Sequence, residues 1–166
     1  MIASRWTVLH KLTLSGNYDD ALLLENLTDI DVLTPCGSSA LHFAVLGGCY
    51  DTVKFIIKHD PHVDRVNFFG ETPLHWACKT GSKEIVKLLL KEGASITVQD
   101  GDGNTPLHWA AEYDNKSIVS LLYSYGASCM DENHDGETPE QVAFLNKSKQ
   151  CVLIFKQLKQ LVAPAQ

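Results

Sequence analysis

Apolar residues recur along this chain at helical spacing, in paired short segments separated by glycine. In the clearest unit, Leu74 and Ala77 lie on one small apolar face, and Gly81 ends the segment. A second segment begins near Lys83 and is apolar on most sides from Ile85 to Leu90. The pattern predicts a helix, a turn and a second helix.

The residues around these two segments are typical of helix ends and turns. Thr72 can cap the first helix with its hydroxyl, and Pro73 suits the first helical position because its missing N–H costs nothing there. Gly93 is a signal for the end of the second helix, and Asp100 to Gly103 is rich in turn residues. One such helix pair cannot bury its own apolar faces, so it must stack on neighbouring pairs.

The same sequence motif recurs with a nearly constant period. Thr72 to Ala77 recurs 33 residues later as Thr105 to Ala110, and related phrases run from Ser39 to Ala44 and from Thr138 to Ala143. A weaker relative, Thr7 to His10, opens the chain. Self-similarity at this period is the signature of a repeat array.

The repeated residues resemble the ankyrin repeat, whose signature joins Thr-Pro-Leu-His-x-Ala to a later Ile-Val pair, a leucine run and Gly-Ala. The resemblance extends over about residues 5 to 155. It implies an all-α fold, an ankyrin repeat solenoid of stacked helix-turn-helix units with hairpin loops, about five units including degenerate caps. The chain departs from the signature at Asp114, where glycine is expected, so that turn is predicted to be strained or reshaped.

We expect one domain over residues 1–166, because the length suits a single domain and no linker interrupts the units. The expected boundaries are an N-terminal capping repeat at 5–33, repeats at 37–69, 70–102 and 103–135, and a C-terminal capping repeat at 136–163.

Charge and cysteine content narrow the choice of partner and compartment. The chain has 14 Lys and Arg against 20 Asp and Glu, a net charge of −6, which argues against nucleic acid and anionic membrane surfaces as partners. The five cysteines form no Cys-x-x-Cys pattern, which favours a reducing compartment. Met1 to Leu14 does not resemble a signal peptide, so we expect a cytoplasmic or nuclear protein, or one in the host cytosol if the chain is an effector. We also expect a monomer.

Four histidines, at 10, 42, 75 and 108, occupy the same repeat position. Packed helices lie about 8–10 Å apart, whereas a Zn–N bond is about 2.0–2.1 Å, so histidines of adjacent units cannot share one ion. We expect them to hydrogen-bond the backbone of the neighbouring loop and fix the stacking.

No metal, cofactor or catalytic site is predicted. Asp131 to Gly136 opens like a calcium loop, but the twelfth position, where a bidentate glutamate is needed, holds Val142. No serine, cysteine or histidine lies in a recognisable nucleophile motif. The chain is therefore not expected to be an enzyme.

The resemblance to ankyrin repeats implies that a partner is held by the hairpin tips and by exposed residues late in the first helix of each unit. These positions form a surface with an apolar centre and a mostly acidic side toward the C-terminus. The predicted protein-binding residues are Leu46, Phe68, Phe69, Glu71, Lys79, Asp102, Asn104, Glu112, Tyr113, His134 and Asp135.

Three structural alternatives remain open at this point. Phe68 and Phe69 either face a partner or fold inward over the hairpin base. Trp76 and Trp109 either pack between helices or join the interface. The apolar last helix, about Lys149 to Val162, is either a buried cap or a surface for a partner or for dimerisation.

The leading hypothesis is a protein-protein interaction module without catalysis. Small ankyrin proteins of this length resemble inhibitors that block a partner by occupying its surface. The alternatives are an interaction domain of a larger signalling or ubiquitin-ligase adaptor protein, and a viral or bacterial effector that mimics host ankyrin inhibitors.

Overall fold

The computed structural model describes residues 33–59 and 62–162, with side chains through residue 160. Of the predicted N-terminal capping repeat, 5–33, only Leu33 is among the described residues. His10 lies outside them. Within the described ranges, helices and loops make up the fold, and the all-α prediction is confirmed. The helices are α3 (Ala40–Gly47), α4 (Tyr50–His59), α5 (Pro73–Thr80), α6 (Lys83–Lys91), α7 (Pro106–Glu112), α8 (Lys116–Ser124), α9 (Pro139–Leu145) and α10 (Lys149–Val162).

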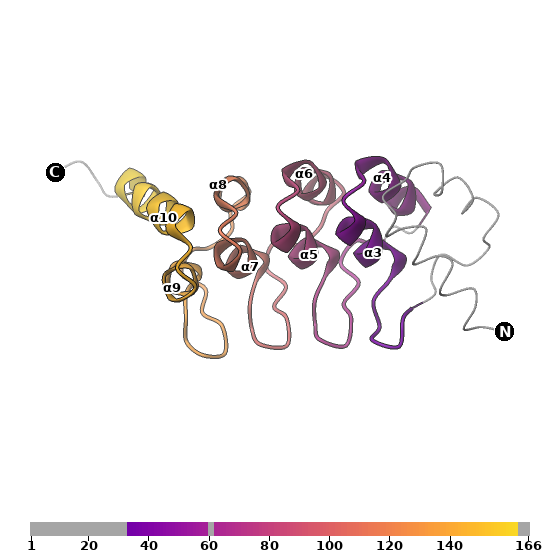
Figure 1. Ribbon diagram of the computed structural model, residues 1–166, viewed down its shortest axis with the longest axis horizontal. Coiled ribbons are helices and arrows are strands. Elements are labelled where there is room, and N and C mark those ends of the chain that lie inside the picture. The colour runs from indigo at the N-terminus through magenta and orange to yellow at the C-terminus, as the bar shows by residue number, and fades with distance from the viewer. Residues whose placement is uncertain (1–32, 60–61, 163–166) are drawn as a thin grey trace.

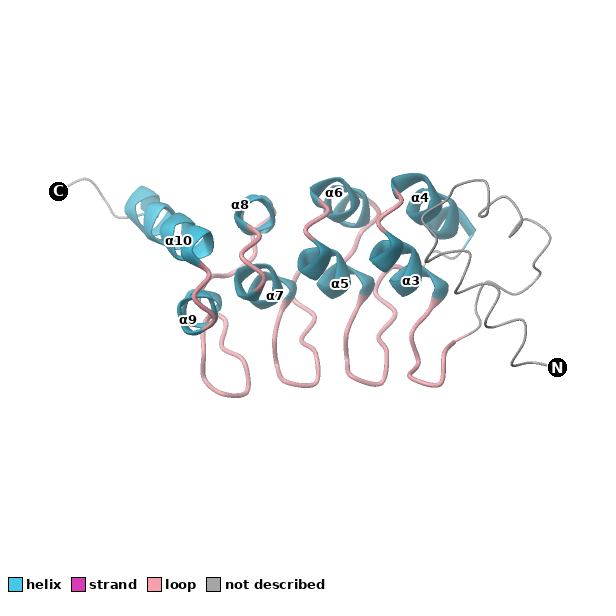
Figure 2. Ribbon diagram, in the orientation of Figure 1, coloured by secondary structure: helices cyan, strands magenta, loops and turns pink. Residues whose placement is uncertain are grey.

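The helices stand in four pairs that follow one another in a row (Figure 1). The first helices of the pairs, α3, α5, α7 and α9, form one layer, and the second helices form the other. Long loops extend from the first-helix layer and run side by side along one edge of the molecule (Figure 2). This arrangement is the predicted linear stack of helix-turn-helix units.

Helix α5 begins and ends where its sequence predicts. The Thr72 hydroxyl accepts a hydrogen bond from the His75 backbone N–H, and Pro73 occupies the first turn. The helix ends at Gly81, which adopts a left-handed conformation with φ 79°. Glycine suits this position because it has no Cβ to oppose a positive φ.

The equivalent turn in the next unit holds Asp114 in place of glycine, with φ 56°. Asp tolerates this conformation better than most residues. Its carboxylate also accepts a hydrogen bond of 2.9 Å from the Cys151 backbone N–H, at the start of α10. The reshaped turn predicted at Asp114 is therefore present, and it also caps the following unit. Lys147 occupies the same repeat position in the last unit, again with a positive φ of 59°.

The core runs the length of the stack between the two helix layers. The repeat leucine of the first helix, Leu41, Leu74 or Leu107, is fully buried in each of the three inner units. The valine of the second helix, Val53, Val86 or Val119, is fully buried as well. Each unit therefore buries its apolar faces against its neighbours, as a repeat array must.

The repeat histidines join each unit to the next, as the sequence predicts. His42 Nε2–H donates to the Glu71 carbonyl, His75 Nε2–H to that of Asn104, and His108 Nε2–H to that of Glu137, each at 3.0 Å. In each ring the other nitrogen, Nδ1, accepts the backbone N–H of the helix-capping residue at 3.1 Å. This pattern requires a neutral imidazole, because a protonated Nδ1 has no lone pair to accept with.

Burial of these rings lowers the pKa of all three histidines. The pKa of His42 falls to about 4, chiefly because desolvation disfavours the charged ring, although the Glu71 backbone contact and carboxylate oppose the shift. Desolvation likewise lowers the pKa of His75 and His108. The hydrogen bonds that these three histidines make between adjacent units therefore depend on neutral imidazole rings.

The last helix combines features of both sequence alternatives. Cys151 and Phe155 of α10 are buried, which makes the helix a packed cap. Leu153 is nevertheless exposed, as is Phe144 of α9 beside it in the wall of one shallow cavity. No helix in the described part of the chain has both the length and the apolar character needed to cross a membrane.

Candidate protein-binding surface

The hairpin loops owe their shape to a polar side chain at a fixed place in each unit. Asn67 Oδ1 accepts the backbone N–H groups of Phe69 and Glu71, at 2.9 and 3.0 Å. Asp100 and Asn133, each 33 residues further along, accept the corresponding pairs of N–H groups. Short polar side chains stabilise such tight turns by bonding their own backbone two residues on.

Neighbouring hairpins are tied together at their tips by the backbone. Phe68 N–H donates to the Cys36 carbonyl at 2.9 Å, Gly101 N–H to the Phe69 carbonyl at 2.7 Å, and His134 N–H to the Asp102 carbonyl at 3.0 Å. The contact is close enough that a Cβ on Gly70 would lie 2.9 Å from the Gly101 nitrogen. The tips therefore form one continuous edge instead of separate loops.

Phe68 and Phe69 project from this edge into solvent. Phe68 is 78% exposed and Phe69 is 60% exposed. The Phe68 ring also lies over the preceding tip, where a Cβ added to Gly37 would approach it to 2.8 Å. The alternative in which both rings fold inward is therefore wrong.

A cavity of about 490 Å³ opens beside Phe69, between the first two described hairpins. Three aromatic side chains line it, together with one carboxylate and residues of the two loops. Its lining residues are Thr34, Pro35, Cys36, Ser38, Phe43, Asn67, Phe69, Glu71 and Trp76.

Trp76 forms the wall of this cavity nearest the helices. Its indole ring is half-buried and meets His42 and Phe43 edge-on, with ring centroids 5.2 and 5.7 Å apart. Its Nε1–H donates to a Glu71 carboxylate oxygen at 2.8 Å, and Asn67 Nδ2 donates to the same oxygen at 2.7 Å. Trp76 thus both packs against the core and faces the cavity, while Glu71 orients it.

A second aromatic group lies one unit further along. The Lys79 Nζ lies 5.1 Å from the centroid of the Tyr113 ring and 5.7 Å from that of Trp109. Both distances are within the range of a cation–π contact. The Trp109 Nε1–H donates to an Asp100 carboxylate oxygen at 2.7 Å, so this indole is held as Trp76 is.

Charge on this surface becomes more negative toward the C-terminus. Glu112 lies near this cluster, and its partial burial raises its pKa although the charge of Lys79 opposes the shift. Asp102, His134 and Asp135 are exposed at the tips. The Asn104 side chain accepts a hydrogen bond from Asn133 Nδ2 at 3.0 Å and so joins two hairpins.

Apart from Leu46, the predicted site residues therefore fall into three groups. Phe69 and Glu71 line the aromatic cavity, and Phe68 precedes Phe69 at the same hairpin tip. Lys79, Glu112 and Tyr113 belong to the second cluster, and the remaining acidic and polar residues lie at the later tips. Leu46 of α3 is 44% exposed. Among the residues described, no three His, Cys, Asp or Glu side chains are grouped so that they could hold a metal ion.

The family described as ankyrin repeats (3 copies) matches residues 9–100 and 92–160, which together make up most of the chain. The chain belongs to the ankyrin repeat family. Ankyrin repeats are generally protein-interaction modules. A search of curated proteins found no match.

Two contributors to this ankyrin surface were not included in the predicted set. Phe43 follows His42 as Trp76 follows His75, so the two aromatic residues share one repeat position on successive units. That register is visible in the sequence and could have identified them as neighbours on one face. The sequence register does not reveal that Phe43 and Trp76 both line the cavity beside Phe69.

Proposed function

We propose that this protein binds a partner protein through its hairpin tips and the adjoining face of its first helices, without catalysis of its own. The single observation that carries this proposal is the pair Phe68 and Phe69, exposed at a hairpin tip beside an aromatic cavity. Turns normally carry polar residues, so two exposed phenylalanines at a tip need a reason.

The surroundings of these rings suit an energetic centre for binding. Binding hot spots are built from aromatic anchors near the middle of an interface, with a polar rim that excludes water. Here Trp76 and Phe43 form a rigid aromatic wall, since the Trp76 indole is already held by Glu71. A partner side chain would enter a site that is largely preformed, which reduces the entropic cost of binding.

The charges on this surface define the kind of partner that fits. The exposed acidic groups Asp102 and Asp135, together with the half-buried Glu112, lie along the stack beyond the aromatic cavity. A matching segment places an apolar side chain in the cavity and basic residues opposite these carboxylates. Charge complementarity of this kind chiefly speeds association and selects the partner's orientation.

The proposal is tested by affinity capture from a cell lysate with the double variant Phe68→Ala, Phe69→Ala. Loss of one hot-spot ring weakens binding by about 2 kcal/mol, or about 30-fold, so the double variant is expected to lose the proteins that the natural chain retains. The midpoint of thermal unfolding is expected to change little, because both rings are largely exposed. Peptide identification of the retained proteins is the readout.

Phe144→Ala is the matched control, because Phe144 is 71% exposed but lies on α9 at the far end of the stack. It is expected to retain the same proteins as the natural chain. Equal retention by all three immobilised proteins would contradict the proposal, and a large fall in thermal stability of the double variant would identify the two rings as core.

A further inference from the structure

The last unit departs from the repeat at a position that is otherwise core. Glu140 occupies the place of Leu41, Leu74 and Leu107, and all three leucines are fully buried. The Glu140 side chain instead pairs with Lys159 Nζ across the two helices of the unit. The last unit therefore has a charged side chain at the repeat position where the inner units have a buried leucine.

The second helix of this unit is also longer than its equivalents. Helices α6 and α8 have nine residues each, whereas α10 has 14. Leu158 and Lys159 lie in the additional turns, beyond the repeat position at which α8 ends. The extension brings both the partner of Glu140 and a further apolar side chain to this place.

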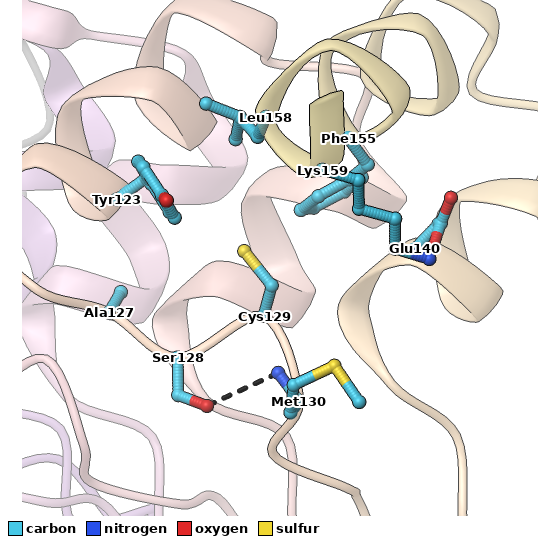
Figure 3. Close-up of a pocket in the computed structure, with 9 residues that line it drawn as sticks. All are labelled: Tyr123, Ala127, Ser128, Cys129, Met130, Glu140, Phe155, Leu158 and Lys159. Atoms are coloured by element: carbon cyan, nitrogen blue, oxygen red, sulfur yellow. Dashed lines mark hydrogen bonds and ion pairs between the residues drawn. The ribbon is translucent and has the colours of Figure 1, made fainter. Parts of the chain in front are cut away.

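Residues of both departures line a cavity of about 460 Å³ between the last two units (Figure 3). Figure 3 shows Tyr123 on one side, Phe155 and Leu158 on the other, and Lys159 reaching toward Glu140 at one end. The apolar part of the wall consists of Tyr123, Ala127, Met130, Phe155 and Leu158. Small-molecule sites are about 300–1,000 Å³, mostly apolar, with a few polar groups that fix orientation.

The two charged groups of this site are not equivalent. The side chain of Glu140 is 22% exposed, whereas that of Lys159 is 61% exposed. The carboxylate is therefore the charge fixed within the wall, and the ammonium lies mostly in solvent on a flexible stem. A ligand that displaces Lys159 loses little, because the lysine end of this ion pair is mostly hydrated and its attraction to Glu140 is screened by solvent.

We propose that this cavity is a binding site for a small amphiphilic amine, with its apolar body against Tyr123, Phe155 and Leu158 and its ammonium group on Glu140. The ammonium takes the place of Lys159 Nζ, and Lys159 turns out to solvent. A carboxylate ligand fits less well, because its charge would lie against Glu140. This site is separate from the proposed protein-binding surface, since none of its lining residues belongs to that surface.

Three probes with one apolar body and different head groups test the assignment: 3-phenylpropylamine, 3-phenylpropanol and 3-phenylpropanoic acid. Titration of the full chain, followed by the shifts of its backbone amide resonances, measures each affinity and locates the contact. The amine is expected to bind at least tenfold more tightly than the alcohol, and the acid more weakly still. The shifted amides are expected in α8, in residues 127–130 and in α10.

Three variants test the role of the two charged side chains. Glu140→Gln keeps the volume and is expected to reduce amine affinity to that of the alcohol. Glu140→Leu restores the repeat residue without a charge, and it is expected to bind the amine no more tightly than the alcohol. Lys159→Ala is expected to strengthen amine binding, because it removes the competing cation.

Absence of amine binding at millimolar concentration would overturn the proposal. So would equal affinities for amine and alcohol, a Glu140→Gln variant that binds the amine as the natural chain does, or shifted amides confined to other units.

Discussion

Acidification from pH 7 to about 4.5 is expected to lower the free energy of unfolding by at least about 2 kcal/mol, through His42 alone. In the unfolded chain this histidine titrates near its ordinary pKa of 6.5, whereas burial lowers its folded pKa to about 4. Between these values the unfolded state binds the extra proton. Stability is therefore fully present above about pH 6.5 and falls as the pH drops toward 4.

His75 and His108 add to this effect, because burial lowers their pKa in the same direction. Protonation of any of the three rings places a hydrogen on Nδ1, which then cannot accept the backbone N–H of the capping residue. Urea unfolding at a series of pH values, followed by circular dichroism, measures the slope.

A variant with glutamine at one of these positions provides the comparison. Gln141 occupies the histidine position of the last unit, where its Oε1 accepts the Thr138 backbone N–H at 2.7 Å. His75→Gln can keep this capping bond, and it is expected to reduce the pH slope. The control is His134→Gln, which makes the same substitution at an exposed hairpin tip and leaves the capping bonds of the three buried histidines intact. A stability that is flat between pH 7 and 4.5 would contradict the account of the histidines.

Leu107→Ala is expected to lower the free energy of unfolding by about 3–5 kcal/mol, the cost of an unfilled cavity at a fully buried leucine. The loss should be large for a chain of this size, because α7 has neighbouring units on both sides and the stack is stabilised by contacts between adjacent units. Chemical denaturation measures the change directly.

Leu46→Ala is the matched control for this prediction. Leu46 is 44% exposed on α3, so its truncation should change the free energy of unfolding by no more than about 0.5 kcal/mol. If Leu107→Ala proved as mild as Leu46→Ala, the leucine layer would not be the core of the stack.

Much of the architecture could be predicted because each unit repeats the same local signals. Thr72 and Pro73 fix the start of a helix and Gly81 its end, and these signals depend on neighbours in sequence only. The role of the histidines could also be predicted, since a residue that recurs at one repeat position must meet the same neighbour in every unit. Asp114 could be identified as a reshaped turn, but its bond to Cys151 depends on a contact between units.

The candidate sites were harder to predict, because they arise where the repeat is broken or where loops meet. Phe68 and Phe69 stand out in sequence as apolar residues in a turn, but their exposure depends on how one hairpin lies over the next. The replacement of leucine by Glu140 was visible as a departure. Its partner, Lys159, lies on the additional turns of α10, and only the packing of that helix brings the two together.

The central claim, that a partner binds the hairpin edge and the adjoining first helices, is tested most directly by hydrogen–deuterium exchange with and without the captured partner. We expect partner-dependent protection at the tips, in residues 67–70 and 100–103, and late in α3, α5 and α7. The outer faces of α4, α6 and α8 should exchange as in the free protein. Protection confined to those second helices, with the tips unchanged, would contradict the account.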